Sequence, residues 1–381
     1  MKGESRGTGP DESTYSRRKD AREEHVAALN HEIDESEKAP SEEIIVNTSN
    51  TALPGEPAAS VISSAAPAQP SAWHRIFRGP KGIRSGWRLI IYAAMVIVVS
   101  LFLQRVTLKI PILASTIRLA SHGTLSPEAL FLIEATGIIS VFSAAWAMSR
   151  IEKRKFGTYG IPFGGAFGHT FWLGISFGLL FETAEMLLIS SMGGFSFGTL
   201  SLAGAALVKS ALLWAVAFVM VGIFEEFLFR GYALFTLSDG IGFWPSAALL
   251  SALFGAVHLG NPGEGWVGGL SVMLFGLFAA FSLQRTGSLW FAIGFHAATD
   301  YAETFIYSVP DSGMLASTHL LNSRLHGPRW LTGGAIGPEG SVFDFALLLA
   351  GFFAVALIFP KKKLGPAVQP SLHFPKEGSP D

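Results

Sequence analysis

The chain has 381 residues and a net charge of −1; 49% of the residues are hydrophobic and only 15% are charged. About a quarter of the residues in a soluble domain are charged, so this composition excludes an ordinary soluble protein and indicates a polytopic membrane protein. The chain has no cysteine, which excludes disulfides, thiolate metal sites and a cysteine nucleophile.

Residues 1–72 are predicted to form a disordered polar tail. The first 45 residues hold 12 acidic and 7 basic side chains, and residues 50–72 are rich in Ala, Pro and Ser. Neither part has enough apolar surface to offset the entropy lost on ordering the chain. We expect a transmembrane domain over residues 73–363 and a short tail over 364–381.

Eight apolar runs follow the tail, and each is close to or above the roughly 20 residues that a helix needs to cross a bilayer. The runs lie near residues 87–107, 128–149, 168–193, 205–237, 242–260, 266–285, 288–308 and 342–359. The sequence therefore predicts an all-α polytopic membrane protein with about eight transmembrane helices.

Basic residues in the connections predict the orientation. Five Lys or Arg lie within 75–88, four within 150–155, one at 285 and three at 361–363, whereas the connections on the other side hold three, none, none and two. Under the positive-inside rule both termini are cytoplasmic, which requires an even number of helices. The long connection at 309–340 is then predicted to lie outside the cytoplasm.

Ionisable residues inside three of these runs are the main functional signal, because a charge within a bilayer is costly. Glu225 lies about 20 Å from the turn at 238–242, and His258 lies about 24 Å from it, at 1.5 Å per helical residue. His296 and Asp300 lie about 12 and 18 Å from the turn near 285–288. We expect these four side chains to meet inside the bundle.

The remaining charges of the cluster have a structural interpretation. Glu226 and Arg230 are four residues apart on one helix and can neutralise each other. Glu225 then remains as the carboxylate available to act as a base. Phe254 lies one turn before His258, and we expect its ring to pack against the site as part of its wall.

Other acids in the apolar runs compete for a role. These acids could form structural pairs or relay protons in a transporter. Many transporters are built from internal repeats, and no repeat relates the two halves of this chain. These acids are Glu134, Glu182, Glu185 and Glu303. Neither a His-Glu-x-x-His helix nor a Gly-x-Ser-x-Gly motif occurs, so an ordinary zinc protease and a serine hydrolase are poorly supported.

Three segments in order resemble the motifs of the CAAX protease and bacteriocin-processing (CPBP) family, which includes type II CAAX prenyl endopeptidases and abortive-infection-like proteins. The segments read Glu-Glu-Phe-Leu-Phe-Arg at 225–230, Phe-Gly-Ala-Val-His at 254–258 and His-Ala-Ala-Thr-Asp at 296–300. The resemblance covers about residues 205–308. It implies an all-α intramembrane endopeptidase whose cavity opens to cytoplasm and lipid.

The resemblance also implies a role for each motif residue. Glu225 would be the general base for a water, assisted by His258, while His296 and the residue at 300 would stabilise the oxyanion. Glu226 and Arg230 would hold the site together. The candidate catalytic residues are Glu225, Glu226, His258, His296 and Asp300, with Arg230 and Phe254 in support.

Asp300 departs from the commoner Asn of this family, and an ionised Asp cannot donate to an oxyanion. Asp300 is therefore either protonated, an orienting partner of His296, or a metal ligand. Glu225, His258, His296 and Asp300 offer a nitrogen and oxygen ligand set suited to zinc. A zinc mechanism and a metal-free glutamate mechanism both remain open.

The function expected from these features is hydrolysis of a peptide bond in a membrane-associated protein or peptide, in a protein embedded in the bilayer of a bacterial plasma membrane. No nucleic-acid partner is expected. The alternatives are a catalytically silent scaffold, a bacteriocin-immunity-type protein and, less favoured, a proton-coupled transporter.

Overall fold

The apolar runs of the sequence fold into long helices. The structure is a computed structural model that describes residues 77–79, 82–120 and 124–360, all within the compact unit Gln69–Asp381. The long helices of this part are α3 (Ser85–Lys109), α5 (Pro127–Ile151), α6 (His169–Ser191), α7 (Gly204–Arg230), α9 (Phe243–His258), α10 (Trp266–Thr286), α11 (Trp290–Tyr301) and α13 (Val342–Ile358). The predicted tails 1–72 and 364–381 lie outside the described residues.

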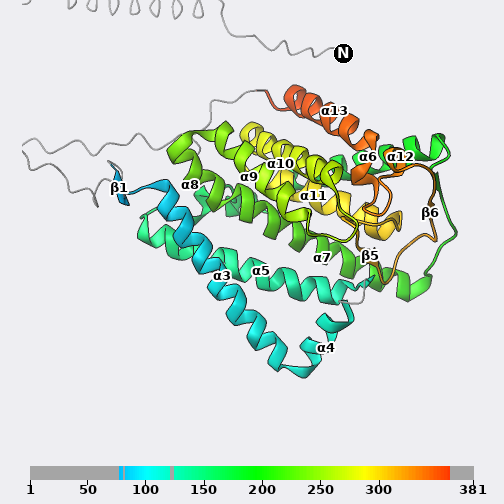
Figure 1. Ribbon diagram of the computed structural model, residues 1–381, viewed down its shortest axis with the longest axis horizontal. Coiled ribbons are helices and arrows are strands. Elements are labelled where there is room, and N and C mark those ends of the chain that lie inside the picture. Colours follow the sequence, from blue (N-terminus) through cyan, green and yellow to red (C-terminus); the bar gives the residue numbers. More distant parts are fainter. Residues whose placement is uncertain (1–76, 80–81, 121–123, 361–381) are drawn as a thin grey trace, which may run out of the picture. The chain divides into compact units, whose positions relative to one another are not determined.

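Five stretches are long and apolar enough to cross a membrane, and two shorter apolar helices, α9 and α13, accompany them. The helix α11 continues into η3, a π-helical turn at Ala302–Ile306, and this pair matches the seventh predicted run. The all-α polytopic fold predicted from the sequence is thus confirmed. Figure 1 shows α3 on one flank of the helices, α13 on the opposite flank, and α7 and α11 between them.

The fourth apolar run was predicted as one helix over 205–237, and this prediction is wrong. The helix α7 ends at Arg230, and a separate helix α8 (Tyr232–Ile241) begins after Gly231. Gly231 has the backbone angles φ −83° and ψ −124°, which no helix accommodates. A side chain there would collide with the carbonyl and ring of Phe227, so glycine permits the break.

Three further short helical elements precede α6 and were not predicted. The helix α4 (Pro111–Ala120) follows α3 directly and starts with a proline, which suits the first turn of a helix. The 3-10 turns η1 (Phe156–Thr158) and η2 (Phe163–Gly165) connect α5 with α6.

The 309–340 connection is tied down at several points. It contains β5 (Leu315–Ala316), β6 (Arg324–Leu325), the short helix α12 (Arg329–Thr332) and the 3-10 turn η4 (Pro338–Gly340). β5 pairs in parallel with β3 (Thr124–Leu125), and β6 pairs antiparallel with β4 (Phe195–Ser196). A third pair, β1 (Arg78–Gly79) with β2 (Gly82–Ile83), lies before α3. In Figure 1 the loop strands lie at the end of the helices away from α8.

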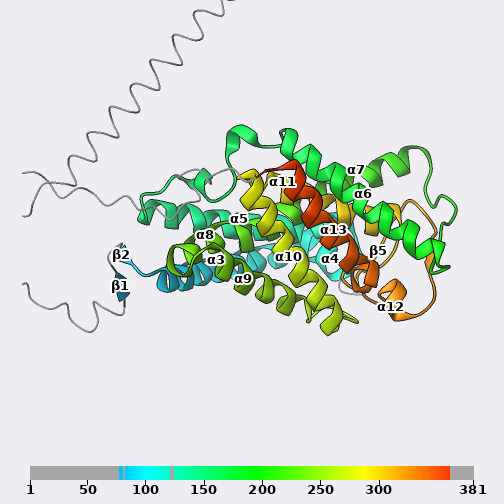
Figure 2. The same cartoon turned by 90° about the horizontal axis from the view of Figure 1, so that it is seen from above.

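Small residues let the helices that carry the site approach closely. A side-chain carbon at Gly174 or Gly178 of α6 would collide with the backbone of α11, and one at Gly294 of α11 would collide with α6. Close approach through small residues is how helices commonly pack in a bilayer. In the view of Figure 2, α13 crosses α10, with which it is in contact.

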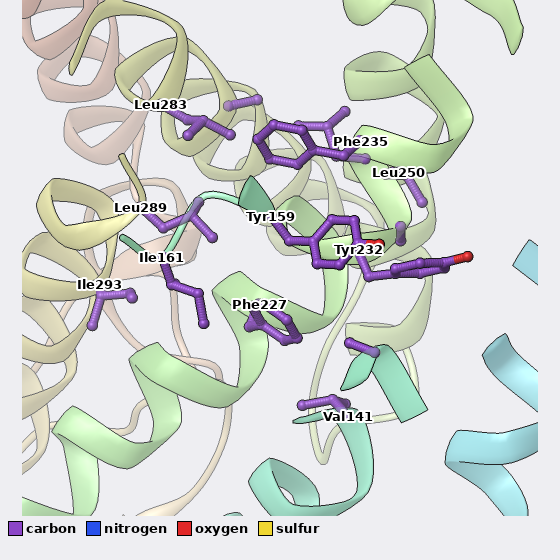
Figure 3. Packing of buried hydrophobic residues seen from close by; sticks show 14 of the residues in the cluster. Val141, Tyr159, Ile161, Phe227, Tyr232, Phe235, Leu250, Leu283, Leu289 and Ile293 are labelled. Atoms are coloured by element: carbon purple, nitrogen blue, oxygen red, sulfur yellow. The ribbon is translucent and has the colours of Figure 1, made fainter. Parts of the chain in front are cut away.

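An aromatic and aliphatic core surrounds the junction of α7 and α8. Phe227 and Tyr232 are fully buried there, against Tyr159 and Leu289; Figure 3 shows these side chains converging from separate segments. At the same end an ion-pair network joins α3, α5 and α8, in which Arg88 contacts Glu152 at 3.1 Å and Asp239 at 3.0 Å. The C-terminal end of α7, which carries the motif residues, is therefore held by packing on several sides.

Candidate active site

A cavity of about 190 Å³ lies between the helices. Glu225, His258, His296 and Asp300, predicted to meet, all line it together with Phe254. Its wall also includes residues of the 309–340 connection, so the cavity extends towards that end of the bundle. The charge rule places that end outside the cytoplasm, and the cytoplasmic opening implied by the family resemblance stays a prediction.

Glu225 is the carboxylate of the adjacent pair that faces the cavity. Its side chain is 23% exposed, and its Oε2 lies 3.7 Å from Nε2 of His296. It therefore combines access to the cavity with a position beside one of the two motif histidines, which is the arrangement a general base for water requires.

Glu226 points the other way and is fully buried. Its Oε1 lies 3.4 Å from Nη1 of Arg230, as the four-residue spacing predicted, and the guanidinium stacks over Phe254 at 4.4 Å. The sequence reasoning missed a second partner: Nδ1 of His296 donates to the same Oε1 at 2.9 Å. The two acids thus differ in environment, and Glu226 joins α7 to α11.

His258 is the last residue of α9, and its Nδ1 donates to the carbonyl oxygen of Phe254 at 2.9 Å. Its ring packs edge-on against the Phe254 ring, with centroids 4.6 Å apart. Phe254 is only 2% exposed and contacts both His258 and Arg230, so it forms the packing wall that was expected. The hydrogen bond at Nδ1 leaves Nε2 of His258 for a ligand or a water.

His296 and Asp300 share one face of α11, as expected from their spacing. Nε2 of His296 lies 3.5 Å from Oδ2 of Asp300, and Thr299 donates to Oδ1 of Asp300 at 3.4 Å. The His296 ring also packs against Phe275, with centroids 4.9 Å apart. Since Nδ1 of His296 is committed to Glu226, its Nε2 is the nitrogen that serves the cavity.

The donor types of the motif residues are ones that zinc accepts, but their spacing is not that of a preformed metal site. Both histidines have Nδ1 held by an acceptor, a carbonyl for His258 and a carboxylate for His296. Histidines that bind a metal through Nε2 are typically oriented in this way. Glu225 and Asp300 would add carboxylate donors of the kind that zinc accepts, but the motif residues are not among the described residues whose ligand atoms gather within 4.8 Å of one another. The same orientation also suits two histidines that act directly on water and substrate.

The cavity is more acidic than the motifs alone suggest. Nine carboxyl groups line it, and no Lys or Arg is among the described lining residues. Glu134, Glu182, Glu185 and Glu303, which were candidates from the sequence, all belong to it. Asp311, Glu339 and Asp344 were missed. Asp344 stands in the last apolar run, where an acid is itself a signal, but the two loop acids carry no such signal.

A family model supports the resemblance seen in the motifs. The model described as "Rce1-like: Type II CAAX prenyl endopeptidase Rce1-like" matches residues 207–302. This range contains all three motifs and most of α7 to α11. No curated protein matches the chain, and no solved structure matches it. Residues 207–302 are therefore similar to the Rce1-like family of type II CAAX prenyl endopeptidases, as the motifs predicted, and the long apolar helices are those of an integral membrane protein.

Proposed function

We propose that the protein is an intramembrane endopeptidase that hydrolyses a peptide bond in a membrane-associated protein or peptide, with Glu225 as the general base. The observation that carries this proposal is the convergence of Glu225, His258, His296 and Asp300 on one cavity within the segment that matches a protease family. We also propose that this proteolysis is of the CPBP type and takes place in a bacterial plasma membrane. In a bacterial membrane, prenylated CAAX substrates are not expected.

The proposed reaction begins with a water held between Glu225 and Nε2 of His258. Glu225 takes a proton from this water as its oxygen attacks the scissile carbonyl carbon. The proton then passes to the leaving amine as the carbon–nitrogen bond breaks. Each step needs the carboxylate on the cavity side of α7, and Glu225 is the one of the pair that is exposed there.

The oxyanion would be stabilised from α11. Nε2 of His296 donates to it when the ring is protonated, because Nδ1 donates to Glu226 and only the imidazolium carries a hydrogen on both nitrogens. Asp300, 3.5 Å from the same Nε2, sets the ring orientation or donates as the neutral acid. A preorganised donor of this kind contributes about 3 kcal/mol to transition-state stabilisation.

A metal is the second form of the same proposal. Glu225, His258, His296 and Asp300 would have to draw closer together to hold a zinc ion, which would supply a Lewis acid for the carbonyl and a more acidic bound water. In either form Glu226 and Arg230 position His296, and Phe254 supports both Arg230 and His258.

The test is cleavage by the purified full-length chain in liposomes that contain a library of membrane peptides, with cut sites identified by mass spectrometry. Glu225→Gln should lower the cleavage rate at least about 100-fold. Glu185→Gln is the matched control, because Glu185 is a buried acid of the same cavity outside the three motifs. Equal cleavage by Glu225→Gln and wild type would refute the assignment of the base.

Two further results separate the alternatives. Cleavage that persists after chelation has removed all zinc supports the metal-free form, whereas loss restored by zinc supports the metal form. A folded wild-type protein that cleaves nothing would favour the silent scaffold or immunity-type protein. Proton-driven movement of a solute across the liposome membrane would favour a transporter. This alternative is considered because nine carboxyl groups line the cavity and could relay protons.

A further inference from the structure

Three carboxylates at the loop end of the cavity form a compact group that the proposed reaction does not use. Glu303, Asp311 and Glu339 each offer an oxygen, and these oxygens lie within 4.8 Å of one another. They come from three separate segments: η3, the start of the 309–340 connection, and η4 near its end. The group thus joins both ends of the connection to the helix that carries His296.

Neighbouring hydroxyls orient two of the three carboxylates. Thr304 donates to Oδ2 of Asp311 at 2.8 Å, and Ser312 lies 3.0 Å from each oxygen of Glu339. The third carboxylate has no such partner: Glu303 is 3% exposed, and its Oε1 is buried without a hydrogen bond. Two groups are held in place and one buried oxygen is left unsatisfied.

The surroundings are rich in negative charge, and the basic side chains on the described cavity wall are two histidines, His258 and His296. Glu182 and Glu185 line the same cavity, and each has a buried Oε1 without a hydrogen-bond partner. No Lys or Arg is among the described residues of the wall. Buried carboxylates are normally protonated, paired or bound to a metal. Burial raises the pKa of Asp311 to about 6, although the hydroxyl of Thr304 and the rings of His296 and His258 act in the opposite direction, and burial also raises the pKa of Glu339.

We propose that Glu303, Asp311 and Glu339 bind a hard divalent cation of the calcium, manganese or magnesium class. Three carboxylates without nitrogen or sulfur form the ligand set that such ions prefer. The cavity has room for the waters that complete their coordination. This site differs from the motif set in ligand chemistry, because His258 and His296 supply nitrogen there.

A cation at this site would fasten the 309–340 connection over the cavity. The connection already contacts the bundle through β5 and β6, and Gly313 N–H donates to the Ile336 carbonyl at 3.0 Å within it. The ion would add a cross-link between η3 and η4 beside the proposed catalytic residues. The cation therefore sets how firmly the loop end of the cavity is closed.

The experiment measures calcium, manganese and magnesium binding to the full-length chain after chelation, by equilibrium dialysis with elemental analysis. Wild type should take up one equivalent of at least one of these ions. Glu339→Gln should weaken that binding more than about tenfold, since loss of even an outer partner costs 10–100-fold. Asp344→Asn, a buried acid of the same wall outside the group, should change it less than about threefold on the same scale.

Two more variants test whether the bound cation is held by this carboxylate group and not by the motif residues. Glu225→Gln should leave this binding intact, which separates it from zinc at the motif residues. Ser312→Ala removes only the hydroxyl beside Glu339 and should weaken binding about tenfold without removing a ligand, so it answers the question if Glu339→Gln does not fold. The proposal is overturned if wild type binds none of the three ions at millimolar concentration. It is equally overturned if Glu339→Gln, or Ser312→Ala in its place, binds as wild type does.

Discussion

The buried contact of Glu226 with Arg230 makes a specific prediction about stability. Arg230→Met leaves the Glu226 carboxylate, which is fully buried, without its guanidinium at 3.4 Å. Two unit charges at this distance attract by about 5 kcal/mol at an effective dielectric constant near 20. Removing one partner of a buried pair typically costs 3–5 kcal/mol. Because His296 still contacts Glu226, we expect a loss of about 3 kcal/mol, at the lower end of this range.

The assay is a double-mutant cycle on the purified chain, with apparent melting temperatures measured at one scan rate. Arg230→Met should lower the melting temperature by roughly 10 °C. The double variant with Glu226→Gln removes both charges and should recover most of this loss. Glu225→Gln is the matched neighbour: its side chain is 23% exposed, and the change should cost less than about 1 kcal/mol. If the two single losses simply add in the double variant, within about 0.5 kcal/mol, the pair is not coupled and the reasoning is refuted.

Three further predictions concern the walls of the site. Asp300→Asn should keep cleavage within about tenfold, because an amide can both orient a ring and donate to an oxyanion; a loss near 1000-fold in the peptide assay would show that a carboxylate is required. Trp214→Phe removes hydrogen bonds of 2.9 and 3.1 Å to Thr318, so it should cost about 1–2 kcal/mol and expose the 309–340 connection to protease; an unchanged digestion pattern would contradict this. Gly178→Leu would press on the carbonyl of Phe295 and should destabilise the protein by at least about 3 kcal/mol, seen as a lower melting temperature; an unchanged value would mean that α6 and α11 can separate.

The sequence identified the motif residues because charges in apolar segments are rare and costly. Glu225, His258, His296 and Asp300 line one cavity, and the simple rise per residue was enough to place them at similar depths. That estimate assumed an unbroken helix from Glu225 to the turn at 238–242. The break at Gly231 shows that the assumption was wrong. The convergence did not depend on this assumption, because Glu225 precedes the break on α7 and the other three residues come from α9 and α11.

Other features depend on tertiary packing and could not be predicted from spacing. The bond between His296 and Glu226 joins residues 70 positions apart, and only the close packing of α11 against α7 brings them together. Asp311 and Glu339 stand in a Gly-rich connection where acids are ordinary. Their partial burial follows from the strand pairs that fold this connection back onto the bundle.

The shortness of α9 has a consequence for the surrounding lipid. Its 16 residues rise about 24 Å, which is less than the roughly 30 Å thickness of a hydrocarbon core. Hydrophobic mismatch of this size thins the adjacent bilayer or draws headgroups inward. If α9 crosses the bilayer, the thinned lipid would lie beside His258, the last residue of α9. Polar headgroups and interfacial water would then approach the motif histidines, and a substrate backbone would need less desolvation to arrive there.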